Sequence, residues 1–361
     1  MGCLNIEEIQ TERKRYNIMV IIQGIALLLL ILALFTLFSY KAPFGMKAMG
    51  ALAGAAIATF LVEAFNAYAI GGLLPLPLYE EVGQAAGSLS GPAAAALVAI
   101  ALGINPVYAL MLGLSVSGFG ILPGFFAGYI LGLLGRRLDK HLPAGVDMIF
   151  YVIIMAPLAR LVAIGIDPIV SNTLAQIGAV IELAATQNPI VMGLVLGGIV
   201  TVVSTSPLSS MALTAMLGLT GVPMAIAALA LTASISMNFL LFKRLNIGTK
   251  KDQLSVAIEP LTQADLISAN PIPIYSVNFV GGALAGLVVA MTGMVNNAPG
   301  SAAGVPGLLV MYGFNDWQTV TVTAVIVFGI GIVAGLVGSK LFKNFPIVSQ
   351  SEKTIEAEEA A

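Results

Sequence analysis

The chain has 361 residues, of which 58% are hydrophobic and only 9% are charged. Soluble globular proteins carry about 25% charged residues, so this composition excludes an ordinary water-facing surface. The net charge of −2 gives no indication of a nucleic-acid partner. Cys3 is the only cysteine, which excludes an intrachain disulfide and argues against a thiolate metal cluster.

Apolar stretches of about 20 residues recur along the chain, and this is the length that crosses a bilayer as an α-helix. We therefore predict an all-α polytopic membrane protein. Arg160 and Asp167 are expected to mark a helix end near the lipid headgroups. The predicted spans, in chain order, are 16–40, 46–79, 92–103, 105–135 with a break near 118–123, 146–166, 169–185, 190–219 with an interruption, 224–242, 274–295 and 319–341.

Basic residues gather in four clusters, at 13–15, 136–140, 243–251 and 340–343. Such residues are enriched on the cytoplasmic side of short loops. The clusters predict about ten crossings with both termini cytoplasmic. Lys41 then falls on the outer side together with Lys47, so either that loop is an exception or the segment 46–79 is re-entrant.

The predicted organisation has three parts. Residues 1–15 form a cytoplasmic N-terminal segment, and residues 16–345 form the transmembrane domain. Residues 346–361 are acidic and are expected to be a disordered tail.

A cluster of hydroxyl side chains interrupts the apolar sequence within "VVSTSPLSSM". Pro207 removes a backbone donor there, and hydroxyl groups repair such a break in a membrane helix. A proline-kinked helix repaired by its own side chains is therefore one interpretation. The other is a broken or re-entrant helix whose hydroxyls bind a polar, neutral substrate, and the number of hydroxyls favours it. The candidate binding residues are Ser204, Thr205, Ser206, Ser209 and Ser210.

Glu63 is the strongest acidic candidate because an ionisable residue inside a membrane span is a functional-site hypothesis by default. Asn66 follows one helical turn later on nearly the same face. A carboxylate beside an amide suits sugar hydroxyls, which both donate and accept hydrogen bonds. The alternative is that Glu63 ends a helix at the membrane interface.

A second polar stretch, "SANPIPIYSVNFVGG", begins at Ser268. Its prolines predict that regular helix does not start before Pro273. Asn270, Tyr275 and Asn278 are then candidate substrate-binding residues near a re-entry point. The alternative is an ordinary helix start capped by the asparagine.

The motifs that carry autonomous catalysis are missing. The single histidine is His141, and the chain holds no HExxH, no GxxxxGK[ST] and no CxxC. ATP hydrolysis, zinc chemistry and dithiol redox chemistry are therefore not expected, and we predict no cofactor and no metal.

The chain resembles the membrane-embedded IIC component of the bacterial sugar phosphotransferase system. It is most similar to the branch that includes the perfringolysin-regulator-type membrane proteins. The resemblance covers about residues 15–345 and rests on "NPIVMGLVLGGIVTVVSTSPLSSMAL" and "ANPIPIYSVNFVGG". It implies a multi-pass protein of the bacterial inner membrane, often a homodimer. Such a protein binds a sugar and moves it inward, while a soluble IIB protein, charged by IIA, donates phosphate.

The leading functional prediction is a IIC-type permease subunit for a neutral sugar or polyol, which phosphorylates its sugar only as part of a complex. In this reading the hydroxyl and amide candidates bind the sugar, and Glu63 orients the hydroxyl to be phosphorylated. Two alternatives remain: a membrane sensor that binds a small polar ligand without phosphoryl transfer, and an ion-coupled secondary transporter.

Overall fold

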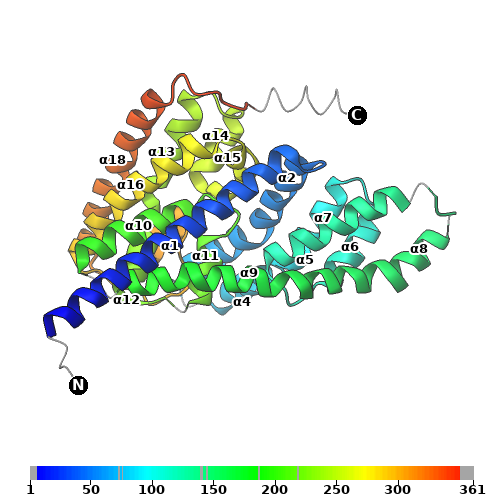
Figure 1. Ribbon diagram of the computed structural model, residues 1–361, viewed down its shortest axis with the longest axis horizontal. Coiled ribbons are helices and arrows are strands. Elements are labelled where there is room, and N and C mark those ends of the chain that lie inside the picture. Colours follow the sequence, from blue (N-terminus) through cyan, green and yellow to red (C-terminus); the bar gives the residue numbers. More distant parts are fainter. Residues whose placement is uncertain are drawn as a thin grey trace.

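The computed structural model describes residues 6–71, 74, 76–138, 141–143, 145–185, 188–217 and 219–349. Helices and their connections make up this part of the chain, and its one β-interaction is an isolated bridge between Gly221 and Asn296 (Figure 1). The predicted all-α class is confirmed for the described residues. Most of the predicted tail, 350–361, lies outside them.

The first half of the chain forms α1 and a series of interrupted helices. Its elements are α1 (Ile6–Lys41), α2 (Gly45–Ala56), the π-helices η1 (Ile57–Leu61) and η2 (Ala64–Ile70), α4 (Pro77–Ser88), α5 (Ser90–Ala101), α6 (Pro106–Ser115), α7 (Ile121–Leu138), α8 (Val146–Phe150), the π-helix η3 (Tyr151–Met155) and α9 (Ala156–Ala185).

The second half contains the most deeply buried candidate span, Gly221–Arg244, and most of the short helices. Its elements are α10 (Pro189–Ser204), α11 (Ser210–Met216), α12 (Gly221–Leu229), α13 (Leu231–Arg244), α14 (Lys250–Ile258), the 3₁₀ helix η4 (Pro260–Gln263), α15 (Ala264–Ala269), α16 (Pro271–Thr292), α17 (Gly304–Met311) and α18 (Trp317–Leu341).

Six helical segments of the described chain are long and apolar enough to cross a membrane, or seven if the bent pair of α4 and α5 is one span. Three shorter apolar helices, one of them the Ala26–Lys41 part of α1, accompany them. A multi-pass membrane protein is thus confirmed. The predicted ten crossings and the cytoplasmic placement of both termini are not confirmed.

The two spans predicted at 146–166 and 169–185 are wrong, because α8, η3 and α9 form one continuous helix. Pro168 lies inside that helix. A membrane helix tolerates the loss of the backbone N–H that proline lacks, because neighbouring groups in the protein satisfy the carbonyl oxygen left without a donor.

Because the helix continues past Arg160, this residue does not mark a helix end. Its guanidinium donates to the carbonyl oxygen of Ser115, the last residue of α6, at 3.0 Å, and to that of Ser117, just beyond the helix, at 3.3 Å.

The start of α16 also differs from the prediction. Regular helix begins at Pro271, and Pro273 lies within its first turn. The first turn of a helix needs no backbone donors, so both prolines fit there without cost. The alternative of a helix that starts after Asn270 is therefore the observed one, although the asparagine side chain does not cap it.

Helices α10 and α16 pack backbone against backbone. A Cβ atom added to Gly197 would lie 2.7 Å from the Cα atom of Gly286, and one added to Gly193 would lie 2.7 Å from the carbonyl oxygen of Gly286. Small residues at matched positions allow membrane helices to approach this closely. The pair forms the centre of the second half of the bundle.

The interruption predicted in 190–219 is present, since α10 ends at Ser204 and α11 begins at Ser210. Ser209 has a φ of 59°, which lies in the left-handed region. Non-glycine residues adopt this conformation at a cost, and β-branched residues are the least suited to it.

We expect Ser209→Val to be less stable than Ser209→Gly by about 1–2 kcal/mol, since valine resists a positive φ. Thermal unfolding of the detergent-solubilised protein measures the difference. Ser209→Ala serves as the control for loss of the hydroxyl. Equal stability of the valine and glycine variants would contradict the positive φ of residue 209.

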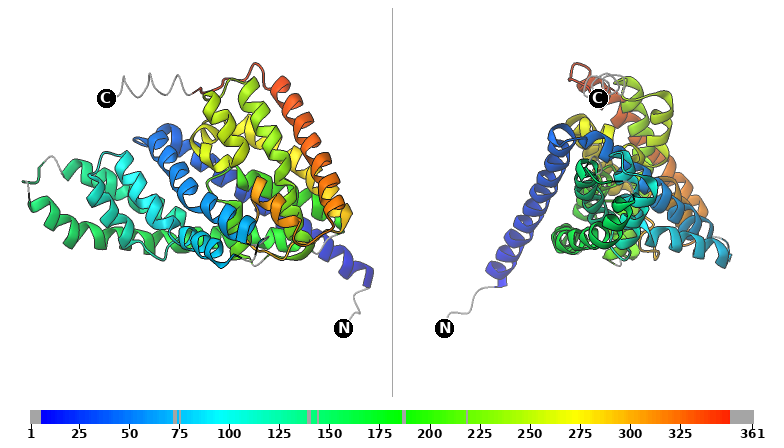
Figure 2. Two further views of the ribbon diagram at one scale, coloured as in Figure 1. Left: turned by 180° about the vertical axis from the view of Figure 1, so that it is seen from behind. Right: turned by 90° about the vertical axis from the view of Figure 1, so that its right-hand side faces the viewer.

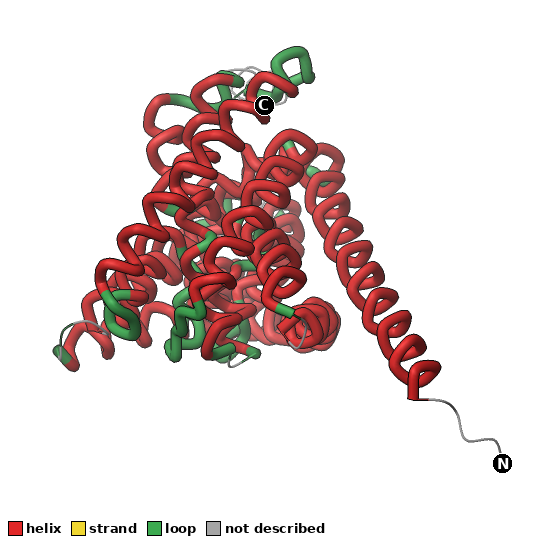
Figure 3. Tube along the Cα trace, turned by 90° about the vertical axis from the view of Figure 1, so that its left-hand side faces the viewer, coloured by secondary structure: helices red, strands yellow, loops and turns green. Residues whose placement is uncertain are grey.

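Helix α1 leans away from the bundle toward its Ile6 end, as Figures 2 and 3 show. Its Lys41 end is held against the bundle, because the Tyr40 hydroxyl donates to the carbonyl oxygen of Ala269.

Lys47 and Arg136 both lie over the ring of Phe44, at 5.8 and 4.4 Å from its centroid. The predicted arrangement that separates Lys47 from the basic cluster at 136–140 is therefore wrong.

Candidate functional site

Six buried side-chain polar atoms have no hydrogen-bond partner within the described residues, and all six come from one part of the chain. An unpaired polar group in the interior costs about 1–3 kcal/mol, so native proteins retain few of them without a function. We call this set the buried polar cluster. Its atoms are Thr232 Oγ1, Asn238 Nδ2, Glu259 Oε2, Ser268 Oγ, Tyr275 Oη and Asn278 Oδ1.

The elements that carry the cluster contact one another. Helix α13 packs against α14 and α16, and η4 packs against α14 and α15. In Figure 1 these helices form the upper part of the bundle, with short α14 and α15 beside long α13 and α16. The chain reverses between them through the short segments η4 and α15.

Two asparagines form one centre of the cluster. Asn278 Nδ2 donates to Asn238 Oδ1 at 2.7 Å and to the carbonyl oxygen of Ile274 at 2.8 Å. Both side chains are fully buried. The pair is left with one unused donor, Asn238 Nδ2, and one unused acceptor, Asn278 Oδ1. A ligand hydroxyl, which both donates and accepts, matches this arrangement.

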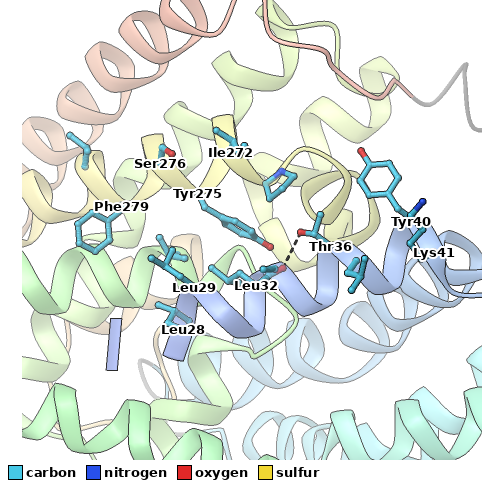
Figure 4. A pocket seen from close by; sticks show the side chains of 15 residues that line it. Leu28, Leu29, Leu32, Thr36, Tyr40, Lys41, Ile272, Tyr275, Ser276 and Phe279 are labelled. Atoms are coloured by element: carbon cyan, nitrogen blue, oxygen red, sulfur yellow. Dashed lines mark hydrogen bonds between the residues drawn. The ribbon is translucent and has the colours of Figure 1, made fainter. Parts of the chain in front are cut away.

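Tyr275 lies one turn before Asn278 on α16, and its hydroxyl neighbours that of Ser268. The Tyr275 ring also lines a large apolar cavity between α16 and α1 (Figure 4). The tyrosine therefore belongs both to the polar cluster and to the wall of that cavity.

Glu259 supplies the carboxylate of the cluster. It lies in extended backbone, with φ −148° and ψ 107°, at the junction between α14 and η4. This junction is outside the candidate membrane-spanning helices. Burial raises the pKa of Glu259 to about 7, and a hydrogen bond from the backbone of Leu261 opposes that rise. A carboxyl group with a pKa near the working pH is suited to general base catalysis.

The pKa of Glu259 predicts a pH dependence of stability. Because the pKa is higher in the folded state than the usual 4.5, the folded protein is stabilised below about pH 4.5. That contribution is lost as the pH rises to about 7. We expect the stability of Glu259→Gln relative to the native protein to increase across this window. Thermal unfolding between pH 4.5 and 8 measures it, and a constant difference would contradict the assignment.

The predicted hydroxyl residues of the 204–210 break lie together and are all buried. Ser204, Thr205 and Ser206 each donate to a backbone carbonyl oxygen three residues earlier, at 2.8 Å. Ser210 donates to the carbonyl oxygen of Ala302, at 2.7 Å. Ser209 lies between them at the turn. These bonds show the hydroxyls repairing the break and tying it to the 293–303 loop.

Glu63 lies between the two π-helices and accepts a hydrogen bond from Tyr68 at 3.3 Å. The wide turns of a π-helix bring residues five apart to the same face. Asn66 does not share this contact, because its amide donates to the carbonyl oxygen of Val62. Tyr68 lines a cavity of about 250 Å³ together with Glu80.

Asn270 is fixed by the C-terminal segment rather than by the polar cluster. Its amide donates to the carbonyl oxygen of Val348 at 3.0 Å, and the backbone N–H of Val348 donates back at 2.9 Å. The side chain also donates to Leu266. Asn270 therefore fastens residues near 348 across the start of α16.

Comparison with known families identifies the family of the chain. Residues 46–354 match the sequence model of the family described as "Phosphotransferase system, EIIC". The chain belongs to the EIIC family. EIIC proteins are the sugar-transporting membrane components of the phosphotransferase system. No curated protein and no solved structure matches the chain.

Within this EIIC protein, Tyr275 and Asn278 are the predicted site residues that the fold brings into the buried polar cluster. The sequence analysis missed Asn238, Ser268 and above all Glu259. One signal for Glu259 was available, since it is a carboxylate directly before Pro260 in the polar segment that separates two apolar spans. Tyr68 was missed because helical periodicity does not pair it with Glu63.

The described residues of this EIIC protein include no group of three or more His, Cys, Asp or Glu side chains that could hold a metal ion. The buried polar cluster itself offers amides, hydroxyls and one carboxylate. These groups bind and orient a hydroxylated ligand and accept a proton from it.

Proposed function

We propose that this EIIC protein binds a neutral sugar or polyol in the buried polar cluster and moves it inward. A separate IIB protein then phosphorylates the sugar. The observation that carries the proposal is the set of unpaired donors and acceptors on α13, α15 and α16 and at Glu259, between α14 and η4. A sugar offers several hydroxyls in a small volume, so one ligand could satisfy several of these groups at once.

In this proposal the asparagine pair holds one sugar hydroxyl between Asn238 Nδ2 and Asn278 Oδ1. Tyr275 and Ser268 bind a second hydroxyl. Glu259 Oε2 accepts a hydrogen bond from the hydroxyl that will be phosphorylated. As the phosphoryl group moves from IIB to that oxygen, the carboxylate takes its proton, which makes the oxygen a better nucleophile.

The position of Glu259 supports access by a soluble partner. Helix α14, which leads to it, begins with Lys250 and Lys251, and α13 ends with Lys243 and Arg244. Basic residues of this kind are enriched on the cytoplasmic side. We therefore propose that the carboxylate faces the compartment in which IIB acts, with the protein in the bacterial inner membrane.

The residues predicted from sequence keep a place in the proposal. The 204–210 break and its hydroxyls allow the bundle to hinge, since the break ends at Ser210 and is bonded to Ala302. Glu63 and Asn66 are proposed to act on the opposite approach to the site, near the cavity that Tyr68 lines. Asn270 holds the C-terminal segment beside the cluster. A homodimer is proposed on the family resemblance alone.

Vesicles containing the purified protein test the function. A panel of labelled sugars is supplied, with or without phosphoenolpyruvate and the soluble phosphotransferase proteins inside. We expect internal sugar phosphate only when those proteins are present. Free internal sugar that needs an ion gradient would instead indicate a secondary transporter. Binding without uptake would indicate a sensor, the role suggested by the regulator-type branch.

A further inference from the structure

A large apolar cavity lies outside the proposed sugar site. A cavity of about 1030 Å³ lies between the Leu28–Lys41 part of α1 and α16 (Figure 4). Leucines of α1 form one wall, including Leu28, Leu29 and Leu32. Phe279 and Val280 of α16 form the opposite wall. The cavity is therefore lined mainly by aliphatic and aromatic side chains.

Two polar side chains of the cavity are already hydrogen-bonded within the protein. The Thr36 hydroxyl donates to the carbonyl oxygen of Leu32 at 2.9 Å, as the dashed line in Figure 4 shows. The Tyr40 hydroxyl donates to the carbonyl oxygen of Ala269. Walls made mainly of aliphatic and aromatic side chains favour a hydrocarbon ligand.

The length of the cavity matches one leaflet of a membrane. From Leu28 to Lys41 the wall extends about 20 Å along α1, at 1.5 Å per residue. Half of the hydrocarbon core is about 15 Å thick. Because α1 is tilted, its wall of about 20 Å spans a smaller depth measured along the bilayer normal. Acyl chains that enter at the Lys41 end would reach about the middle of the bilayer.

Positive charge is found at one end of the cavity. Lys41 lines it directly, and Lys47 follows in the adjoining turn, over the Phe44 ring. Each lysine near a membrane surface attracts anionic lipid. The opposite end, at Leu28 and Leu29, is apolar.

We propose that this cavity binds one anionic phospholipid. Its acyl chains lie between α1 and α16, and its phosphate group lies beside Lys41. The lipid fills the space that α1 leaves open and attaches the helix to the bundle below the Tyr40 contact. This site is separate from the proposed sugar site, although the ring of Tyr275 forms part of the wall between them.

Native mass spectrometry and thermal unfolding of the delipidated protein test the proposal, with phosphatidylglycerol and phosphatidylcholine as probes. We expect phosphatidylglycerol to bind more tightly and to raise the unfolding temperature more. Lys41→Gln should weaken phosphatidylglycerol binding about fivefold and leave phosphatidylcholine unchanged, the effect of losing one lysine at a membrane surface.

A matched pair of variants tests the position of the lipid. Val280 lines the cavity and is 57% exposed, whereas Val333 is 60% exposed on α18 and does not line it. Val280→Trp should abolish the stabilisation by phosphatidylglycerol, and Val333→Trp should retain it. Equal binding of both lipids, or retention in both variants, would overturn the proposal. A change in oligomer mass in Val280→Trp without any lipid effect would mean that a second copy fills the cavity.

Discussion

Replacing Glu259 with glutamine is expected to lower the rate of sugar phosphorylation about 100-fold or more, the usual contribution of a general base. Glutamine has the same shape and also sits well in a buried site, so the loss reports the missing proton acceptor. Binding of free sugar should change much less than the rate. In the native protein the rate should rise with pH through about 7, as the Glu259 carboxyl group loses its proton. The glutamine variant should lack that rise.

Two other carboxylates serve as comparisons for this result. Glu182→Gln changes an exposed residue of α9 and should leave the rate unchanged. Glu63→Gln tests the carboxylate that the sequence singled out, and it should affect uptake more than phosphorylation. If Glu63→Gln abolished phosphorylation while Glu259→Gln did not, the buried polar cluster would not be the site of the chemistry.

Replacing Gly197 with leucine is expected to lower the unfolding temperature by about 10 °C or more, or to prevent accumulation of the folded protein. A leucine side chain at this position would meet the backbone of α16 rather than movable side chains. The two helices would have to separate, which would expose the contact along their whole length. Fluorescence-detected gel filtration after heating measures the effect.

Gly165→Leu provides the matched control in α9, since a Cβ at Gly165 meets nothing within 4 Å. The same substitution there should leave the unfolding temperature nearly unchanged. Equal losses at both positions would mean that leucine disturbs insertion into the membrane, and not the packing of α10 on α16.

Much of the fold could be predicted from the sequence because its signals are local. Long apolar runs gave the class, and Pro207 with its hydroxyls gave the break between α10 and α11. Proline was nevertheless a poor guide to helix ends. Pro168 continues a helix and Pro271 starts one, since the outcome depends on whether a backbone donor is needed at that turn.

The candidate site was harder to predict. Whether a buried polar atom lacks a hydrogen-bond partner depends on the three-dimensional packing around it, which the sequence does not show directly. Ser204, Thr205 and Ser206 look like a binding site in sequence, yet each bonds to its own helix. Tyr275 and Asn278 were predicted as site residues, but Ser268 and Asn238, which lie beside them, come from other helices. Only the packing of α13 and α15 on α16 brings these residues together.

The continuous helix through Pro168 has a mechanical consequence. Its 38 residues from Val146 to Leu183 extend about 57 Å, whereas the hydrocarbon core is about 30 Å thick. A helix of this length wholly within the core would need a tilt of about 60°, beyond the range of about 0–40° found for most membrane helices, so this helix both tilts and extends past the core. A thicker or thinner bilayer changes that tilt. Because α9 contacts both α7 and α10, the change shifts the first half of the bundle relative to the second.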